Sequence, residues 1–256
     1  MSRPAVEIVN SILNIWKIAV QSIMLLVLWT AVFREKKGKR DGIAAALFIF
    51  ANIGIGFLPC TVWVQYGVSA FAIMGYAGIC YKKQIGKAVF VMLAFYNLHC
   101  LGYLMASSIY EKIINVMMKS LDMMKDSYLQ EMYRCMAVGM FCLVFAYSVL
   151  FVAMVLILYR LMKDVTIMAW QDVILLSILN FVGSMIANVV NGLLIVRINT
   201  DAFVLFDEKP DLLWKVPMIA LCIFAGEAAL IYFWQRYHIL LAERQKHFVE
   251  EQQVKA

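Results

Sequence analysis

The chain has 256 residues, of which 64% are hydrophobic and 16% are charged, and its formal net charge is +6. An ordinary soluble domain is roughly 45–50% apolar and about 25% charged, so this composition excludes a typical water-soluble protein. It favours an all-α polytopic membrane bundle, because backbone groups in lipid must be hydrogen-bonded within their own segment.

Apolar runs of about 20 residues predict seven transmembrane helices. The predicted spans are Ile8 to Phe33, Gly42 to Pro59, Thr61 to Tyr81, Ala88 to Ser107, Cys135 to Tyr159, Asp172 to Val196 and Lys215 to Trp234. The first run is too long for the apolar part of a cleavable signal peptide, so we expect it to remain as a span. We expect a transmembrane domain over residues 1–236 and a helical extension over residues 237–256.

Basic residues gather in three short connections, at 34–41, 82–87 and 160–164, which follow the first, third and fifth predicted spans. The positive-inside rule places these connections in the cytoplasm, with the N-terminus outside and the C-terminus inside. The net positive charge is then accounted for by loops facing an anionic leaflet, and no nucleic-acid partner is expected.

The segment from Ile109 to Met124 carries apolar residues at helical spacing, interleaved with charged ones. This pattern predicts a separate amphipathic helix lying on the outer surface of the membrane. Such a helix either rests on lipid or, through its Met-rich face, covers an external ligand pocket.

Polar side chains are expected at one depth in five spans. Glu227 lies about nine residues from the inner end of its span, roughly 13 Å into a hydrocarbon core of about 30 Å. Counting in the same way places further polar residues near it, namely Asn52, Asn97, His99 and Asn180, with Gln21 close by. An ionisable residue at this depth is a functional hypothesis, whereas the amides also fit ordinary interhelical hydrogen bonds.

One face of the sixth predicted span is lined by small or polar side chains at i, i+4 spacing. A stripe of this kind permits close approach of helices in lipid. Its members are Gly183, Ser184, Ala187, Asn188, Asn191 and Gly192.

Several chemistries lack the residues that they need. The last span has no mid-membrane Lys for a retinal Schiff base, and the six cysteines show no C-x-x-C spacing for a metal site. His99 and Cys100 are consecutive and point about 100° apart on a helix, which does not suit a cysteine peptidase. We expect no catalytic residue, no metal and no cofactor in this chain.

The charged end of the chain contains no helix breaker between Trp234 and Ala256. Small and polar residues recur there in a heptad pattern, which is typical of the start of a weak coiled coil. The seam residues are Ala242, Gln245, Val249 and Gln252. We predict one continuous helix through the last span and this tail, suited to transmitting a rotation or a shift.

In layout, the chain resembles the membrane sensor region of a bacterial receptor histidine kinase of the GHKL-ATPase class, which includes peptide-pheromone receptors. The resemblance rests on "DEKPDLLWKVP" (Asp207 to Pro217), which leads into the last span, and on "ERQKHFVEEQQVKA" (Glu243 to Ala256), which leaves it. His247 departs from the phosphoacceptor pattern of that family, since Phe248 follows it and Glu251 stands where Asn is expected. The residues also lack an ATP-binding motif, so the chain itself is expected to be no enzyme.

The resemblance implies an input module of a two-component system in the bacterial cytoplasmic membrane. It implies an extracellular ligand of peptide type, a homodimer in the full-length protein, and a response regulator reached only through a kinase domain that these residues lack. Two other readings stay open at the level of sequence: a small-solute transporter or permease that uses Glu227, and a membrane scaffold without a ligand.

Overall fold

The structure is a computed structural model, and it describes the chain apart from residues 1–2, 34–38, 57–61, 81–84, 122–123, 125–126, 164–168, 209–211 and 256. Side chains are also not described at residues 3, 39–40, 62–63, 65, 192–208, 212–213 and 249–255. The described part is helical throughout, which confirms the all-α prediction. The helices are α1 (Arg3–Val32), α2 (Lys39–Gly56), α3 (Val62–Cys80), α4 (Ile85–Lys119), α5 (Tyr128–Met162), α6 (Trp170–Glu208) and α7 (Leu212–Lys255).

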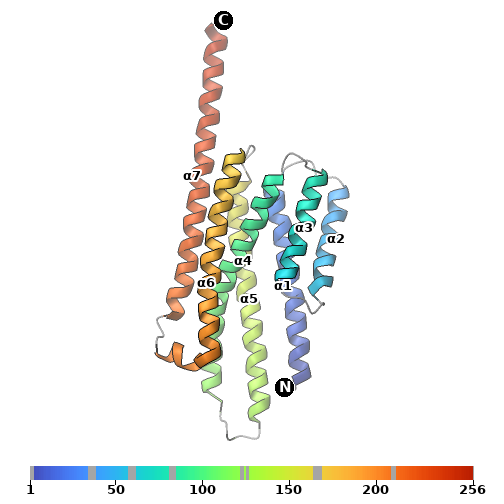
Figure 1. Cartoon of the computed structure of the whole chain (residues 1–256), viewed down its shortest axis with the longest axis vertical. Helices are drawn as coiled ribbons and strands as arrows, with labels where there is room; N and C mark the ends of the chain where they lie inside the picture. The colour runs from blue at the N-terminus through green and yellow to red at the C-terminus, as the bar shows by residue number, and fades with distance from the viewer. Residues whose placement is uncertain are drawn as a thin grey trace.

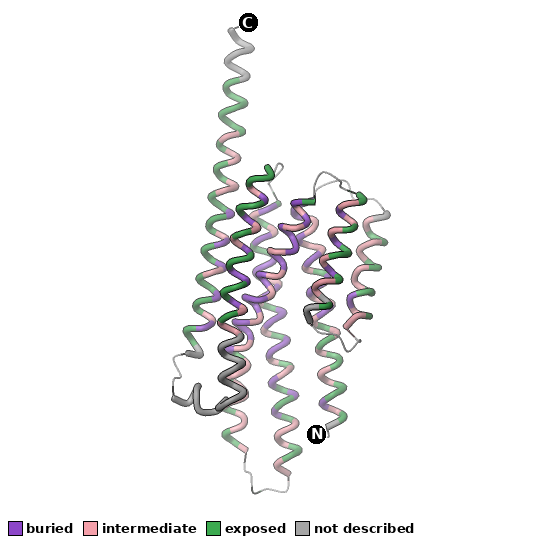
Figure 2. The backbone as a smooth tube through the Cα atoms, viewed as in Figure 1, coloured by how far each residue is buried: buried purple, intermediate pink, exposed green. Residues whose placement is uncertain are grey.

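Successive helices run up and down in one bundle, and the two chain ends lie at opposite ends of the molecule (Figure 1). Helix α4 is central, since it packs against α1, α3, α5, α6 and α7. Helices α2 and α3 lie at one side of the bundle, where α2 contacts α1 and α3. Buried residues concentrate along the middle of α4 and α5 (Figure 2).

Five helices are long and apolar enough to cross a membrane: α1, α4, α5, α6 and α7. Helices α2 and α3 are apolar but shorter, with 18 and 19 residues, which corresponds to about 27–29 Å at 1.5 Å per residue. A hydrocarbon core is about 30 Å thick, so both helices are close to the length that a span needs.

The expectation of a separate external helix at Ile109–Met124 is wrong. Residues up to Lys119 are instead the last turns of α4. No Gly or Pro interrupts this stretch, and α5 packs against it, because a Cβ added to Gly139 would lie 2.7 Å from Ile114 Cδ1 and 2.9 Å from Tyr110 Cε2. The apolar side of the segment is therefore turned partly toward α5, and not only toward lipid.

One further helix is longer than predicted, whereas the continuous helix expected through the last span and the tail is confirmed. Helix α6 continues past Val196 to Glu208, shortly before Pro210, and Pro disfavours helical conformation in the residue before it. Helix α7 has 44 residues and runs without interruption through Trp234 and Glu243, with Pro217 near its start. Its C-terminal part projects beyond all other helices (Figure 1).

The core between α4 and α5 is aromatic. Tyr147 and Phe151 are 1% and 0% exposed and stack with ring centroids 5.4 Å apart, while Phe95 of α4 meets Phe151 edge-on at 5.6 Å. Gly102 of α4 faces the same cluster, since a Cβ there would lie 3.1 Å from Met154 Cε and in ordinary contact with Phe151 and Tyr147. This packing holds the middle of α4 in a fixed rotation, which positions the polar groups described next.

Candidate functional site

Three buried polar residues meet where α4, α6 and α7 pack together; we call them the Glu227 group. Asn97 of α4 donates from Nδ2 to Glu227 Oε2 at 2.6 Å and to Asn180 Oδ1 of α6 at 3.3 Å. All three are buried: Glu227 is 5% exposed, Asn97 0% and Asn180 2%. The sequence prediction placed these residues at one depth, and the structure brings them into contact.

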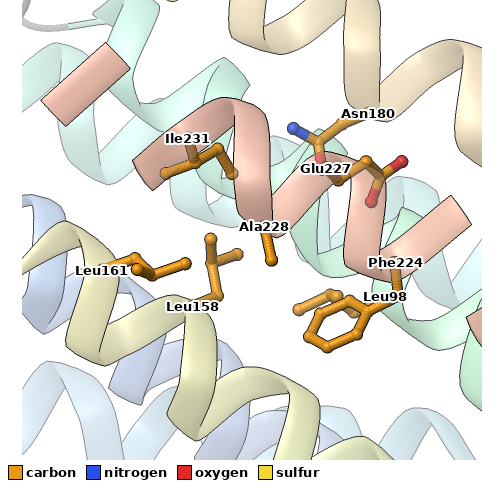
Figure 3. Close-up of a pocket in the computed structure, with 8 residues that line it drawn as sticks. All are labelled: Leu98, Leu158, Leu161, Asn180, Phe224, Glu227, Ala228 and Ile231. Carbon is orange, nitrogen blue, oxygen red and sulfur yellow. The ribbon is translucent and has the colours of Figure 1, made fainter. Parts of the chain in front are cut away.

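A small apolar cavity adjoins the Glu227 group (Figure 3). Glu227 and Asn180 lie together on one side of it, while side chains of α4, α5 and α7 form the rest. These apolar lining residues are Leu98, Leu158, Leu161, Phe224, Ala228 and Ile231. The space open to the centre of a water molecule is about 10 Å³, close to the least volume in which one water fits.

Gly183 of α6 is what lets the Glu227 group assemble. A Cβ at this position would collide with Glu227 Oε1 and would lie 2.7 Å from Asn97 Oδ1. The carboxyl and amide groups therefore fill the space that any other residue would take. Of the small face predicted on this helix, Ser184 and Ala187 are also buried and Asn191 is half-buried.

A second polar cluster lies on the other side of α4; we call it the His99 group, comprising Gln21, Tyr66, His99 and Tyr147. Gln21 Nε2 of α1 lies 2.9 Å from Tyr147 Oη and 3.0 Å from His99 Nδ1, and His99 Nδ1 lies 2.7 Å from Tyr147 Oη. Tyr66 of α3 accepts a longer bond from Gln21 at 3.3 Å. This cluster joins α1, α3, α4 and α5.

The predicted single layer is thus divided into separate groups. Asn97 and His99 are two residues apart, so their side chains point about 200° apart around α4. Sequence reasoning fixed their depth but not the rotation of α4 relative to its neighbours. It also missed Tyr66 and Tyr147, because a Tyr in an apolar run gives no signal of its own.

Removing the Tyr147 hydroxyl should weaken the His99 group. Tyr147→Phe keeps the ring but leaves the buried amide of Gln21 and the half-buried ring of His99 with fewer partners, and we expect a loss of about 1–3 kcal/mol of stability. Thermal unfolding of the purified protein in detergent measures it. Tyr159→Phe is the matched control on the same helix, since the half-buried Tyr159 shows no side-chain hydrogen bond within the described part. Equal melting temperatures for the two variants would contradict the prediction.

Asn52 lies apart from both groups and joins α2 to α3. Its Nδ2 donates to Phe48 O at 3.0 Å, and its Oδ1 accepts from Ser69 Oγ at 2.6 Å. A second small cavity lies between Asn52 and Ser69 on one side and two members of the His99 group, Gln21 and Tyr66, on the other. The Asn52–Ser69 pair is therefore separated from the His99 group by this cavity.

Asn188 of the predicted small face is bonded to α4. Its Nδ2 donates to Tyr96 Oη at 3.0 Å, and its Oδ1 lies 3.8 Å from Cys100 Sγ. Tyr96, Asn97, His99 and Cys100 lie on one turn of α4. Through them, this turn has polar contacts with α1, α5, α6 and α7.

A further contact, which sequence reasoning missed, holds α7 to the start of α6. Asp172 Oδ1 accepts from Trp234 Nε1 at 2.8 Å and lies 3.2 Å from His238 Nε2, while Asp172 Oδ2 accepts from the backbone N–H of Ala169 at 3.0 Å. We call this the Asp172 clamp. Asp172 belongs to the first turn of α6, and α6 starts at the end of the bundle from which α7 projects (Figure 1).

The tail beyond the clamp makes few contacts. Ala242 and Gln245 of the predicted seam are exposed, and so is Phe248 at 61%. The side chains of Val249 and Gln252 lie outside the described residues, although the backbone there is helical.

Comparison of the chain with protein-family models, with curated proteins and with solved structures gave no match. Function therefore has to be argued from the geometry of this chain alone.

Proposed function

We propose that this chain is the input module of a membrane receptor, in which α7 carries a signal from the bundle to a cytoplasmic output domain. The observation that carries the proposal is the continuity of α7. The same helix holds Glu227 in the interior and runs on, unbroken, past the ends of the other helices.

Two sets of hydrogen bonds between α7 and the bundle support a role of α7 in signal transmission. The Glu227 group attaches α7 to α4 and α6 within the bundle, and the Asp172 clamp attaches it to α6 at the point of exit. A rearrangement among α4, α6 and α7 would therefore move the projecting helix as a rigid body, since a helix resists bending more than a loop does. A sensor histidine kinase of the GHKL class, with a peptide ligand and a bacterial cytoplasmic membrane location, is the specific form that we propose.

The role can be tested without knowing the ligand. We would join Ala256 in helical register to the dimerisation and catalytic domains of a histidine kinase, and insert one to seven alanines after Leu241, beyond the Asp172 clamp. If the bundle sets the rotation of α7, autophosphorylation should rise and fall with insertion length and return after seven residues, the heptad repeat. Activity that does not depend on insertion length would contradict the proposal.

The seven-span topology is part of the same proposal. The ends of α1, α3 and α5 lie at the end of the bundle from which α7 projects (Figure 1), and the basic segments 34–41, 82–87 and 160–164 lie at or directly after these ends. By the positive-inside rule this end is cytoplasmic, which leaves the N-terminus outside.

Single-cysteine labelling tests the topology. In a background without the native cysteines, an impermeant maleimide added to intact cells should label Ser120→Cys and should not label Lys39→Cys until the cells are opened. Labelling of Lys39→Cys from outside would reverse the orientation, and labelling of both positions would contradict an odd number of spans between them.

A second candidate function is a permease for protons or small solutes, and the buried Glu227 favours it, because ionisable residues within membranes often line transport pathways. Reconstitution into liposomes with an internal pH-sensitive dye separates the two functions. Proton entry that is lost in Glu227→Gln would support transport; the receptor proposal expects no such flux.

A further inference from the structure

Two oxygen atoms in the Glu227 group have no hydrogen-bond partner within the described part of the chain. Glu227 Oε1 and Asn97 Oδ1 are both fully buried, and neither contacts a donor. Leaving a buried acceptor unsatisfied costs about 1–3 kcal/mol each, so two of them side by side need an explanation.

The orientation of the Asn97 amide is fixed by its neighbours. Asn180 Nδ2 donates to the backbone carbonyl of Leu176 at 2.7 Å, so Asn180 must present its oxygen toward α4. That oxygen faces Asn97 Nδ2, which is therefore the donor atom, and the same nitrogen donates to Glu227 Oε2. Exchanging the two ends of the Asn97 amide would set its oxygen against Asn180 Oδ1, so the contact with Asn180 fixes Asn97 Oδ1 as the free acceptor atom.

The two orphan oxygens lie close to one and the same point of the structure. Both flank the same point beside Gly183, where a Cβ would lie 2.7 Å from Asn97 Oδ1 and closer still to Glu227 Oε1. An ionised carboxylate and an amide oxygen are acceptors only, so this pair would repel. A carboxylic acid, in contrast, offers one O–H donor.

We infer that this site binds one proton: Glu227 carries it on Oε1 and donates it to Asn97 Oδ1. The carboxyl and the amide then form a ring with two hydrogen bonds, in which each group donates once and accepts once. One proton taken from water satisfies both orphan atoms and removes a buried charge. A proton fits better than a water or a metal cation, because neither oxygen is accessible to a water-sized sphere.

The surroundings of the ring are uncharged within the described part of the chain. The residues that face Glu227 are Leu98 and Asn97 from α4, Leu158 and Leu161 from α5, and Asn180 and Gly183 from α6. None of them is titratable, so no cation stands ready to balance an ionised Glu227. The proton site holds whether or not α7 transmits a signal, so it stands independently of the receptor role.

Infrared difference spectroscopy of the whole chain in lipid nanodiscs at neutral pH tests the site. The spectrum should contain a C=O stretch of a protonated carboxylic acid that is absent in Glu227→Gln. In Asn97→Leu this band should move to higher frequency, because the carboxyl loses its amide partner. If Glu227→Gln removes only a carboxylate band, or if the acid band appears only after Na⁺ is replaced by choline, the proton assignment is overturned.

Thermal unfolding gives a second readout that does not depend on Asn97→Leu being folded. The amide of Glu227→Gln can donate to Asn97 Oδ1 as the acid does, so this variant should melt near the wild-type temperature. Glu227→Leu is similar in size but removes both bonds and should melt well below it. If Glu227→Gln and Glu227→Leu lowered the melting temperature equally, the ring would be overturned. That result would mean that a donor at this position of Glu227 makes no stabilising hydrogen bond to Asn97 Oδ1.

Discussion

Gly183→Leu should destabilise the bundle by about 2–5 kcal/mol. The new side chain would enter the space held by Glu227 and Asn97, so it adds the cost of an overpacked core to that of buried polar groups forced apart. Thermal unfolding in detergent measures the change, and loss of folded protein during purification is its extreme form.

Gly226→Leu is the matched control for this variant. It makes the same chemical change next to Glu227, but a Cβ at Gly226 meets nothing within 4 Å. Both variants gain the same helix propensity, so their difference reports the packing around Gly183. If the two proteins melt together, the close approach of α6 to α4 and α7 does not hold the Glu227 group in place.

Inserting Gly-Gly after Arg244 should abolish the dependence of kinase output on helix phase in the fused receptor described above. Two glycines each cost about 1 kcal/mol of helix propensity and also turn the following residues by about 200°, so the helix should break there. Autophosphorylation across the alanine series should then become flat.

An insertion that keeps the helix and its phase is the control. Seven residues with high helix propensity, added after Arg244, lengthen the tail by about 10 Å and return it to the same face of the seam. This fusion should keep the periodic output. If the Gly-Gly series stayed as periodic as the seven-residue one, rigid transmission along α7 would have to be abandoned.

The depth of the polar residues in their spans could be predicted from the sequence, but the contacts between them could not. Glu227, Asn97 and Asn180 could be singled out because polar residues in apolar runs are costly, and counting from the span ends places them at one height. Their contact depends on the rotation of three helices, which hydropathy does not encode. The same limit explains why Tyr147 and the partners of Asp172 were missed.

The ends of several helices were also predicted wrongly, for a different reason. The charged residues after Ser107 keep a helical period, and a period of 3.6 looks the same in a separate surface helix as in a continuation of α4. Only the packing of Gly139 against Tyr110 and Ile114 distinguishes the two. The end of α6 was also missed: the prediction stopped the span at Val196, although the helix continues to Glu208, close to the helix breaker Pro210.

The order in which the helices are synthesised determines when the Glu227 group can form. Asn97 and Asn180 precede Glu227 in the chain, Asn97 by 130 residues, so both amides leave the ribosome before their carboxyl partner. The hydrogen bond from Asn97 to Asn180 can satisfy part of these two amides before α7 is present. The ring between Asn97 and Glu227 forms only after α7 has packed against α4 and α6. The last helix to be made therefore supplies the carboxyl group that completes the Glu227 group, and a chain that stops before Glu227 would leave Asn97 and Asn180 without this partner.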